Sequence, residues 1–362
     1  MTFTTEELEI LYEQLIGAQY YARIYQSINI VLFSFAFLIN IFHCSILLRK
    51  ELRASSIFFL MIAISMFEIF RSVVLIARYI YEVSMYGNQT YCYEYSSFIG
   101  ILFKIVTTSL TSVIDNTVSW IVVWMALIRT LSVVFPLSSF TENLSEKRGP
   151  TVKMVICGIV CSMLYEGYIV SPNEIALVGK DELCVPNPTR LNITVLPTQY
   201  RIETWNFMKR GQYNVIHEFL IIAKLKSILH IVLTIFLVKA VKDAAKLRKI
   251  IRKSEVDKTE STTRLIAISS MLFCISDIPE LIYKIYSELF KDDIVSRMSA
   301  KHVPEVLTIL TSIHSISHFF VCYFMSSQYK EAVKNVFGRG KVGTTILSAE
   351  AATGTVPNSL TV

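Results

Sequence analysis

Seven long and mainly apolar segments follow one another along the chain, with shorter polar stretches between them. A helix of a water-soluble protein repeats polar residues along its wet face, and these segments lack that repeat. Their lengths approach or exceed the ~20 residues with which a helix crosses the hydrocarbon core of a membrane. The pattern therefore predicts seven membrane-spanning helices, at residues 28–48, 56–80, 98–127, 152–171, 217–239, 265–287 and 303–325.

The composition agrees with a protein whose solvent is lipid. Of the 362 residues, 53% are hydrophobic and 18% are charged, and the mean hydropathy is +0.49. A water-soluble domain carries about a quarter charged residues. The segments at 98–127 and 265–287 are the least obvious by hydropathy alone. Because a backbone in lipid must satisfy its hydrogen bonds internally, the predicted fold class is an all-α membrane protein, a bundle of seven transmembrane helices.

The placement of charge predicts the orientation of the bundle. Residues 49–53 read Arg-Lys-Glu-Leu-Arg, and the stretch 239–264 holds nine Lys or Arg against four acids. The positive-inside rule assigns both loops to the cytoplasm. The segment 1–27 is acidic and lacks the apolar core of a cleavable signal peptide. We therefore expect an extracellular N-terminal segment, a cytoplasmic C-terminus and a multi-pass plasma-membrane protein that binds no nucleic acid.

The long loop of residues 172–216 is extracellular by this topology. It contains Asn192-Ile193-Thr194, a glycosylation acceptor pattern, and Asn192 is the predicted site. The sequon at Asn88 lies too close to the membrane for efficient use. The sequon at Asn143 falls on the predicted cytoplasmic face, so glycosylation there would contradict the topology.

Two of the seven cysteines, Cys92 and Cys184, fall on the predicted extracellular side, where disulfides form. A disulfide between them would tie the long outer loop to the top of the third span and roof a cavity. Two unrelated free thiols are the alternative, which is unusual outside the cell.

The chain after the seventh span predicts a short amphipathic helix at residues 326–338. Tyr329, Val333 and Phe337 fall on one side of it and Lys330 and Lys334 on another. The remaining tail, 339–362, is rich in Gly, Thr and Ala and is predicted to be disordered.

The cytoplasmic end of the third span carries a motif. Ile128-Arg129-Thr130, followed by Pro136-Leu137, resembles the Asp-Arg-Tyr box and the following Pro-Leu of rhodopsin-like G-protein-coupled receptors. An Arg alone at a helix end could be an anchor that reaches toward the interface. The resemblance implies that Arg129, Ile128, Thr130 and Pro136 form the contact region for a heterotrimeric G protein. Ile128 replaces the family's acid, which suggests a less firmly locked resting state.

Further matches appear in order along the chain. Asn40 resembles the polar Asn of the family's first span, and Glu68 stands where the second span carries an Asp. A buried acid is costly in a membrane and generally functional, and Arg71, one turn on, could partly neutralise it. The resemblance implies an activation switch made of these groups and the matching positions of the sixth and seventh spans: Asn40, Glu68, Phe273, Asp277, Pro279, His318 and Tyr329.

Three stretches, 125–131, 276–279 and 324–329, resemble the nematode serpentine chemoreceptors of class w, Srw. That class is similar to receptors for FMRFamide-like neuropeptides. The resemblance runs from about residue 28 to 338. It fails at Leu229, where the fifth span of the class usually has a Pro, and in the fourth span, which has no Trp.

Five charged residues in the outer half of the predicted bundle are candidates for ligand binding. Mixed charges of this kind suit a peptide or a zwitterionic small molecule; the alternative is that these groups pair with each other and bind nothing. The candidates are Lys104, Asp115 and Asp277 in the outer half, with Glu280 and Arg78 nearer the mouth.

The function predicted from these features is that of a chemosensory receptor that senses a peptide or small polar ligand and activates a G protein. A neuropeptide receptor is the first alternative. A transporter or channel is the second, disfavoured because the sequence has no inverted repeat. We expect no enzyme and no cofactor, because the soluble segments carry no catalytic or phosphate-binding motif. His314 and His318, one turn apart, are interpreted as polar packing rather than as a metal pair.

Overall fold

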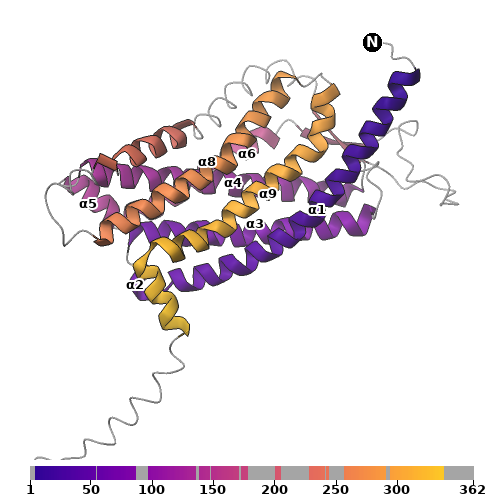
Figure 1. Ribbon diagram of the computed structural model, residues 1–362. Coiled ribbons are helices and arrows are strands. Elements are labelled where there is room, and N and C mark those ends of the chain that lie inside the picture. Colours follow the sequence, from indigo (N-terminus) through magenta and orange to yellow (C-terminus); the bar gives the residue numbers. More distant parts are fainter. Residues whose placement is uncertain are drawn as a thin grey trace, which may run out of the picture.

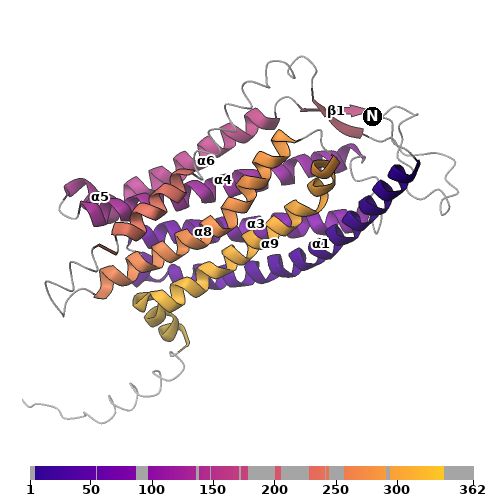
Figure 2. The same ribbon diagram turned by 45° about the horizontal axis from the view of Figure 1, so that its top comes forward.

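The computed structural model describes residues 5–53, 55–86, 97–135, 138–146, 148–170, 173–177, 200–204, 228–240, 242–243, 257–290 and 294–337. Within these ranges seven helices run side by side as one elongated bundle (Figures 1 and 2). Each corresponds to one predicted span, which confirms the predicted fold class. They are α1 (Thr5–Leu47), α3 (Ser56–Tyr86), α4 (Phe98–Val134), α6 (Arg148–Val170), Ile228–Ala240, α8 (Asp257–Leu289) and α9 (Ile294–Met325).

Shorter elements join these helices at the two ends of the bundle. α2 (Lys50–Arg53) and α5 (Ser139–Glu146) lie at one end, together with a helix of residues 327–337. We call this the Arg129 end, because α4 brings Arg129 there. At the opposite end, the strand end, β1 (Asn173–Leu177) pairs antiparallel with β2 (Tyr200–Thr204). Both strands fall within the loop 172–216.

Five of the helices are long and apolar enough to cross a membrane: Ile24–Leu47, Ser56–Ser84, Phe98–Ser132, Arg148–Tyr168 and Val303–Phe324. Ile228–Ala240 is apolar but shorter in its described part. The third span therefore meets the criterion, although its hydropathy looked weak. α8 does not, since it combines Asp277, Glu280 and Lys284 with its apolar residues, yet it packs in the bundle against α4 and α9.

The helix boundaries follow from local signals. α1 begins at Thr5, well before the predicted span at 28. Ser97 caps α4, where its hydroxyl oxygen accepts a hydrogen bond from the Gly100 N–H at 3.2 Å. α4 ends at Val134, and the Phe135 N–H donates a hydrogen bond to the Leu131 carbonyl. Pro136 follows in the sequence and has no backbone N–H with which to continue the helix. Pro279 lies inside α8.

Apolar side chains point both inward and outward. The most tightly packed part of the core lies toward the Arg129 end, where Leu47, Leu52, Ile57, Ile128 and Leu237 are almost fully buried. Large apolar side chains on the outside are widely exposed, as expected of surfaces that face lipid rather than water. Examples are Val31, Leu38, Ile99, Leu164 and Ile235.

Candidate functional site

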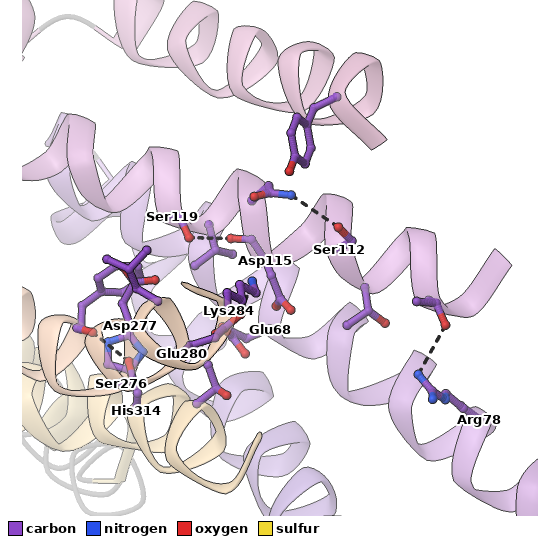
Figure 3. A pocket seen from close by; sticks show the side chains of 18 residues that line it. Glu68, Arg78, Ser112, Asp115, Ser119, Ser276, Asp277, Glu280, Lys284 and His314 are labelled. Atoms are coloured by element: carbon purple, nitrogen blue, oxygen red, sulfur yellow. Dashed lines mark hydrogen bonds and ion pairs between the residues drawn. The ribbon is translucent and has the colours of Figure 1, made fainter. Parts of the chain in front are cut away.

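A cavity of about 370 Å³ opens between the middle of the bundle and the strand end (Figure 3). Pockets of 300–1,000 Å³ are typical of small-molecule sites. Five helices contribute to its wall. The lining residues with polar or charged side chains are Glu68 and Arg78 of α3, Thr108, Thr111, Ser112, Asp115, Asn116 and Ser119 of α4, Tyr165 of α6, Ser276, Asp277, Glu280 and Lys284 of α8, and Thr311 and His314 of α9.

An ion triad on α3 and α4 forms one side of the cavity. The Arg71 Nε lies 2.7 Å from an Asp115 carboxylate oxygen, and one of its terminal nitrogens lies 3.8 Å from Glu68. Arg71 and Glu68 are buried, with side chains 6% and 9% exposed, whereas the Asp115 side chain is 48% exposed. The guanidinium therefore connects a buried acid to an acid that faces the open cavity, as well as joining two helices.

Two further ion pairs lie nearer the strand end. Arg78 contacts Glu82 one turn along α3 at 2.8 Å and approaches the Thr108 hydroxyl of α4 at 3.5 Å. On α8, Lys284 contacts Glu280 one turn earlier at 2.5 Å. Both pairs are of the i,i+4 type, the spacing at which side chains of one helix face meet. Each of these two ion pairs lies within one helix.

A buried acid of α6, Glu166, contacts a residue that lines the cavity. Glu166 of α6 is buried and accepts a hydrogen bond of 2.6 Å from the Ser112 hydroxyl, and Ser112 lines the cavity. This contact ties α6 to α4 beside Asn116, whose side-chain amide lies 3.5 Å from the same hydroxyl.

Four of the five predicted ligand-binding residues line this cavity: Arg78, Asp115, Asp277 and Glu280 (Figure 3). Lys104 lies about one turn farther toward the strand end on α4 and is not among the lining residues. Lys284 and Glu166 were not predicted. Lys284 could have been found from its position four residues after Glu280, and Glu166 as an acid inside an apolar segment.

Aromatic rings connect the cavity floor with deeper layers of the bundle. Phe273 of α8 packs edge to face between His230 of the fifth helix and His314 of α9. Its ring centroid lies 4.7 Å from that of His230 and 5.4 Å from that of His314. His314 meets His318, one turn on, edge to face, with the ring centroids 4.5 Å apart. The Ser269 hydroxyl lies 3.4 Å from the Nδ1 of His318. Three helices thus meet through these rings.

Polar contacts hold α1 against the C-terminal part of the chain, and two of them involve residues of the predicted switch. The Asn40 side-chain amide donates to the Ser315 hydroxyl of α9 at 2.9 Å. His43 Nδ1 lies 2.7 Å from the Tyr329 hydroxyl, so the helix of residues 327–337 is attached to α1. Tyr329 is fully buried, and this burial raises the pKa of its phenol.

At the Arg129 end, Ile128 is buried in the apolar core and Arg129 is half-buried. The Thr130 hydroxyl donates to the Ala126 carbonyl of its own helix at 2.8 Å. The Arg129 Nε is buried and has no hydrogen-bond partner in the described part of the chain. Within those residues no acid forms an ion pair with Arg129. Pro136, Cys92, Cys184 and Asn192 lie outside the described residues.

The arrangement can bind a polar ligand and transmit a change of packing. Among the described residues no group of three His, Cys, Asp or Glu side chains converges to hold a metal ion. The charges, rings and hydrogen bonds instead join helices to one another, so a ligand that contacts the cavity wall would act on how those helices pack.

A known protein family matches most of this chain. The family model described as serpentine type 7TM GPCR chemoreceptor Srw matches residues 27–340, which include the second half of α1 and the whole of the other six helices. The match does not support the expected similarity to receptors for FMRFamide-like neuropeptides. Among curated proteins none matches the chain.

Proposed function

Because this chain belongs to the serpentine seven-transmembrane chemoreceptor family Srw, we propose that it binds a peptide or small polar ligand in the cavity and activates a heterotrimeric G protein. Membership of this family, with its several apolar membrane-spanning helices, makes the chain a multi-pass receptor of the plasma membrane. The observation that carries the proposal is the position of the cavity. It is lined by polar and charged side chains, lies within the bundle, and shares Phe273 and His314 with the ring contacts beneath it.

The proposed orientation places the strand end outside the cell and the Arg129 end in the cytoplasm. Basic side chains of the described residues gather at the Arg129 end, which supports this orientation through the positive-inside rule. They include Arg49, Lys50, Arg148, Lys239, Lys242, Lys330 and Lys334. The N-terminus is then extracellular, and the cavity opens toward the outside.

The proposed mechanism is a shift between two packings of the bundle. A ligand favours the state to which it binds more tightly, and it can shift the equilibrium only by that difference in affinity. Phe273 lies between His230 and His314, so movement of α8 at the cavity changes the contacts of three helices at once. In the active state the Arg129 end of α8 moves outward, and Arg129 contacts an inserted helix of the G protein.

The experiment that tests this proposal measures second-messenger output from cells that express the chain. The cells are exposed to a library of metabolites and peptides, with Arg129→Ala as the inactive control. We expect at least one compound to raise output in cells with the natural chain and to leave the Arg129→Ala cells unchanged at equal surface expression. A response of equal size in both would contradict G-protein coupling through Arg129.

A further inference from the structure

Arg71 lies between two acids and contacts one of them more closely than the other. Its Nε lies 2.7 Å from Asp115 of α4, and a terminal nitrogen lies 3.8 Å from Glu68 of its own helix, α3. The Arg71 Nε and the Glu68 Oε2 are both buried, and neither has a hydrogen-bond partner of good alignment among the described residues. The guanidinium is therefore not fixed at either acid by a directed hydrogen bond.

The two acids differ in how open they are to the cavity. Both line it, but the Asp115 side chain is 48% exposed and the Glu68 side chain is 9% exposed (Figure 3). The Arg71 side chain is 6% exposed and is not among the lining residues. A ligand that enters the cavity therefore reaches Asp115 before it reaches Arg71. A hydrogen-bond donor on that ligand competes with Arg71 for the Asp115 carboxylate.

Only a small movement separates Arg71 from a direct contact with Glu68. A charge-assisted hydrogen bond measures about 2.7–2.9 Å, so the terminal nitrogen at 3.8 Å is about 1 Å too far from the Glu68 carboxylate. The two residues are three positions apart on α3, a spacing at which side chains of one helix face meet. Rotation about the side-chain bonds of Arg71 can therefore close this gap without any movement of α3.

The two positions of the guanidinium differ in the helices that they join. The contact with Asp115 joins α3 to α4, whereas a contact with Glu68 lies within α3. Transfer of Arg71 from one acid to the other therefore removes an ion pair between two helices. α4 also carries Arg129, about 21 Å farther along the helix than Asp115 at ~1.5 Å per residue. Loss of the pair frees the cavity half of the helix whose other half reaches the Arg129 end.

We propose that Arg71 is a two-position switch at the cavity. It contacts Asp115 in the described packing, and it moves to Glu68 when a ligand uses the Asp115 carboxylate as its hydrogen-bond acceptor. Arg71 acts through Asp115 and does not touch the ligand, so it is a positioning residue. Ligand binding then releases α4 from α3 at the cavity. This rests on the proposed function only in taking the cavity as the ligand site.

The test withdraws the Asp115 carboxylate from Arg71 by substitution, without any ligand. Asp115→Asn keeps the size of the side chain and leaves Arg71 with Glu68 as its acid. The purified full-length chain in mixed micelles carries isotope-labelled arginine for NMR, and the Arg71 Nε–H signal is identified by its loss in Arg71→Lys. We expect Glu68→Gln to leave this signal nearly in place in the natural chain. In the Asp115→Asn background it should move the signal several times farther, since only there does the guanidinium contact Glu68 directly.

Equilibrium unfolding of the same variants measures the strength of the new contact. We expect Glu68→Gln to reduce the folding equilibrium constant about tenfold more in the Asp115→Asn background than in the natural chain, which is about 1.4 kcal/mol of coupling between contacting residues. Glu331→Gln is the matched control, because Glu331 is exposed on the helix of residues 327–337, far from the cavity, and should have the same effect in both backgrounds. Asp115→Ser is the second background in case Asp115→Asn does not fold.

Two results would overturn the switch. If Glu68→Gln moves the Arg71 signal equally in both backgrounds, the guanidinium has not changed its position. If Glu68→Gln changes stability equally in both, Arg71 gains no new contact with Glu68. The samples contain neither ligand nor G protein, so a chain that passes both measurements but gives no second-messenger response in cells would instead contradict the proposed function.

Discussion

The ion triad of Arg71, Glu68 and Asp115 allows a graded prediction about stability. The distances alone suggest that Asp115 is the more important partner, at 2.7 Å against 3.8 Å for Glu68. Burial suggests the opposite, because the Glu68 side chain is 9% exposed and that of Asp115 is 48% exposed. An acid open to solvent is hydrated whether or not it is paired, whereas a buried acid depends on its partner.

Arg71→Gln removes the shared cation and leaves the Glu68 carboxylate buried without its ion partner. Breaking a buried pair in this way costs about 3–5 kcal/mol of the free energy of unfolding. Asp115→Asn removes a half-exposed partner and should cost about 1 kcal/mol or less, the range of exposed pairs. Arg71→Gln combined with Glu68→Gln leaves no buried charge, so we expect it to be less destabilised than Arg71→Gln alone.

The assay is equilibrium unfolding of the purified chain in mixed micelles, followed by helical circular dichroism, for these three variants and the natural sequence. Surface expression serves as a check that each variant inserts into the membrane. If Asp115→Asn costs as much as Arg71→Gln, or if the double variant is less stable than the single one, the reasoning from burial is refuted.

Three further predictions concern the other contacts of the bundle. Asn40→Leu loses the hydrogen bond to Ser315 and should cost about 0.6–2 kcal/mol in the same unfolding assay, the range of hydrogen bonds between membrane helices; an unchanged stability would show that the contact contributes nothing. Tyr329→Phe keeps the ring and removes the hydroxyl that meets His43, so hydrogen exchange in residues 327–337 should accelerate about fivefold, as for a loss of about 1 kcal/mol, while α4 remains protected. Ile128→Asp restores an acid beside the motif arginine and should lower basal second-messenger output at equal surface expression, whereas unchanged output would contradict the loose resting state.

The architecture could be predicted from the sequence wherever a helix is uniformly apolar. The first, second, fourth and seventh spans follow from hydropathy because lipid requires long apolar stretches. The sixth span was among the least obvious by this measure, since Asp277, Glu280 and Lys284, which line the cavity, lower the hydropathy of α8. Pro279 and its neighbouring motif residues supported this span independently of hydropathy. The charges that obscure the helix are those that form the site.

Contacts within one helix could be predicted, and contacts between helices could not. The spacing of Glu68 and Arg71 indicates that they meet, since they lie three residues apart. Asp115 is nevertheless the closer partner of Arg71. This contact depends on how α3 and α4 pack against each other, and the spacing of residues in the sequence does not indicate it. The same is true of His43 and Tyr329, which are 286 residues apart. The cavity could therefore be predicted as a set of charged residues, but not how those residues pair.

Nucleotide exchange tests most directly whether a ligand in the cavity controls the opposite end of the bundle. The full-length chain in lipid nanodiscs is mixed with heterotrimeric G protein, and the exchange rate is measured against the concentration of the compound that gives the strongest cellular response. We expect exchange to rise with concentration in the natural chain, the curve for Asp277→Asn to shift to higher concentration, and Arg129→Ala to show no stimulation while its melting temperature still rises with the compound. Stimulation that persists in Arg129→Ala, or a curve that Asp277→Asn leaves in place, would contradict the account.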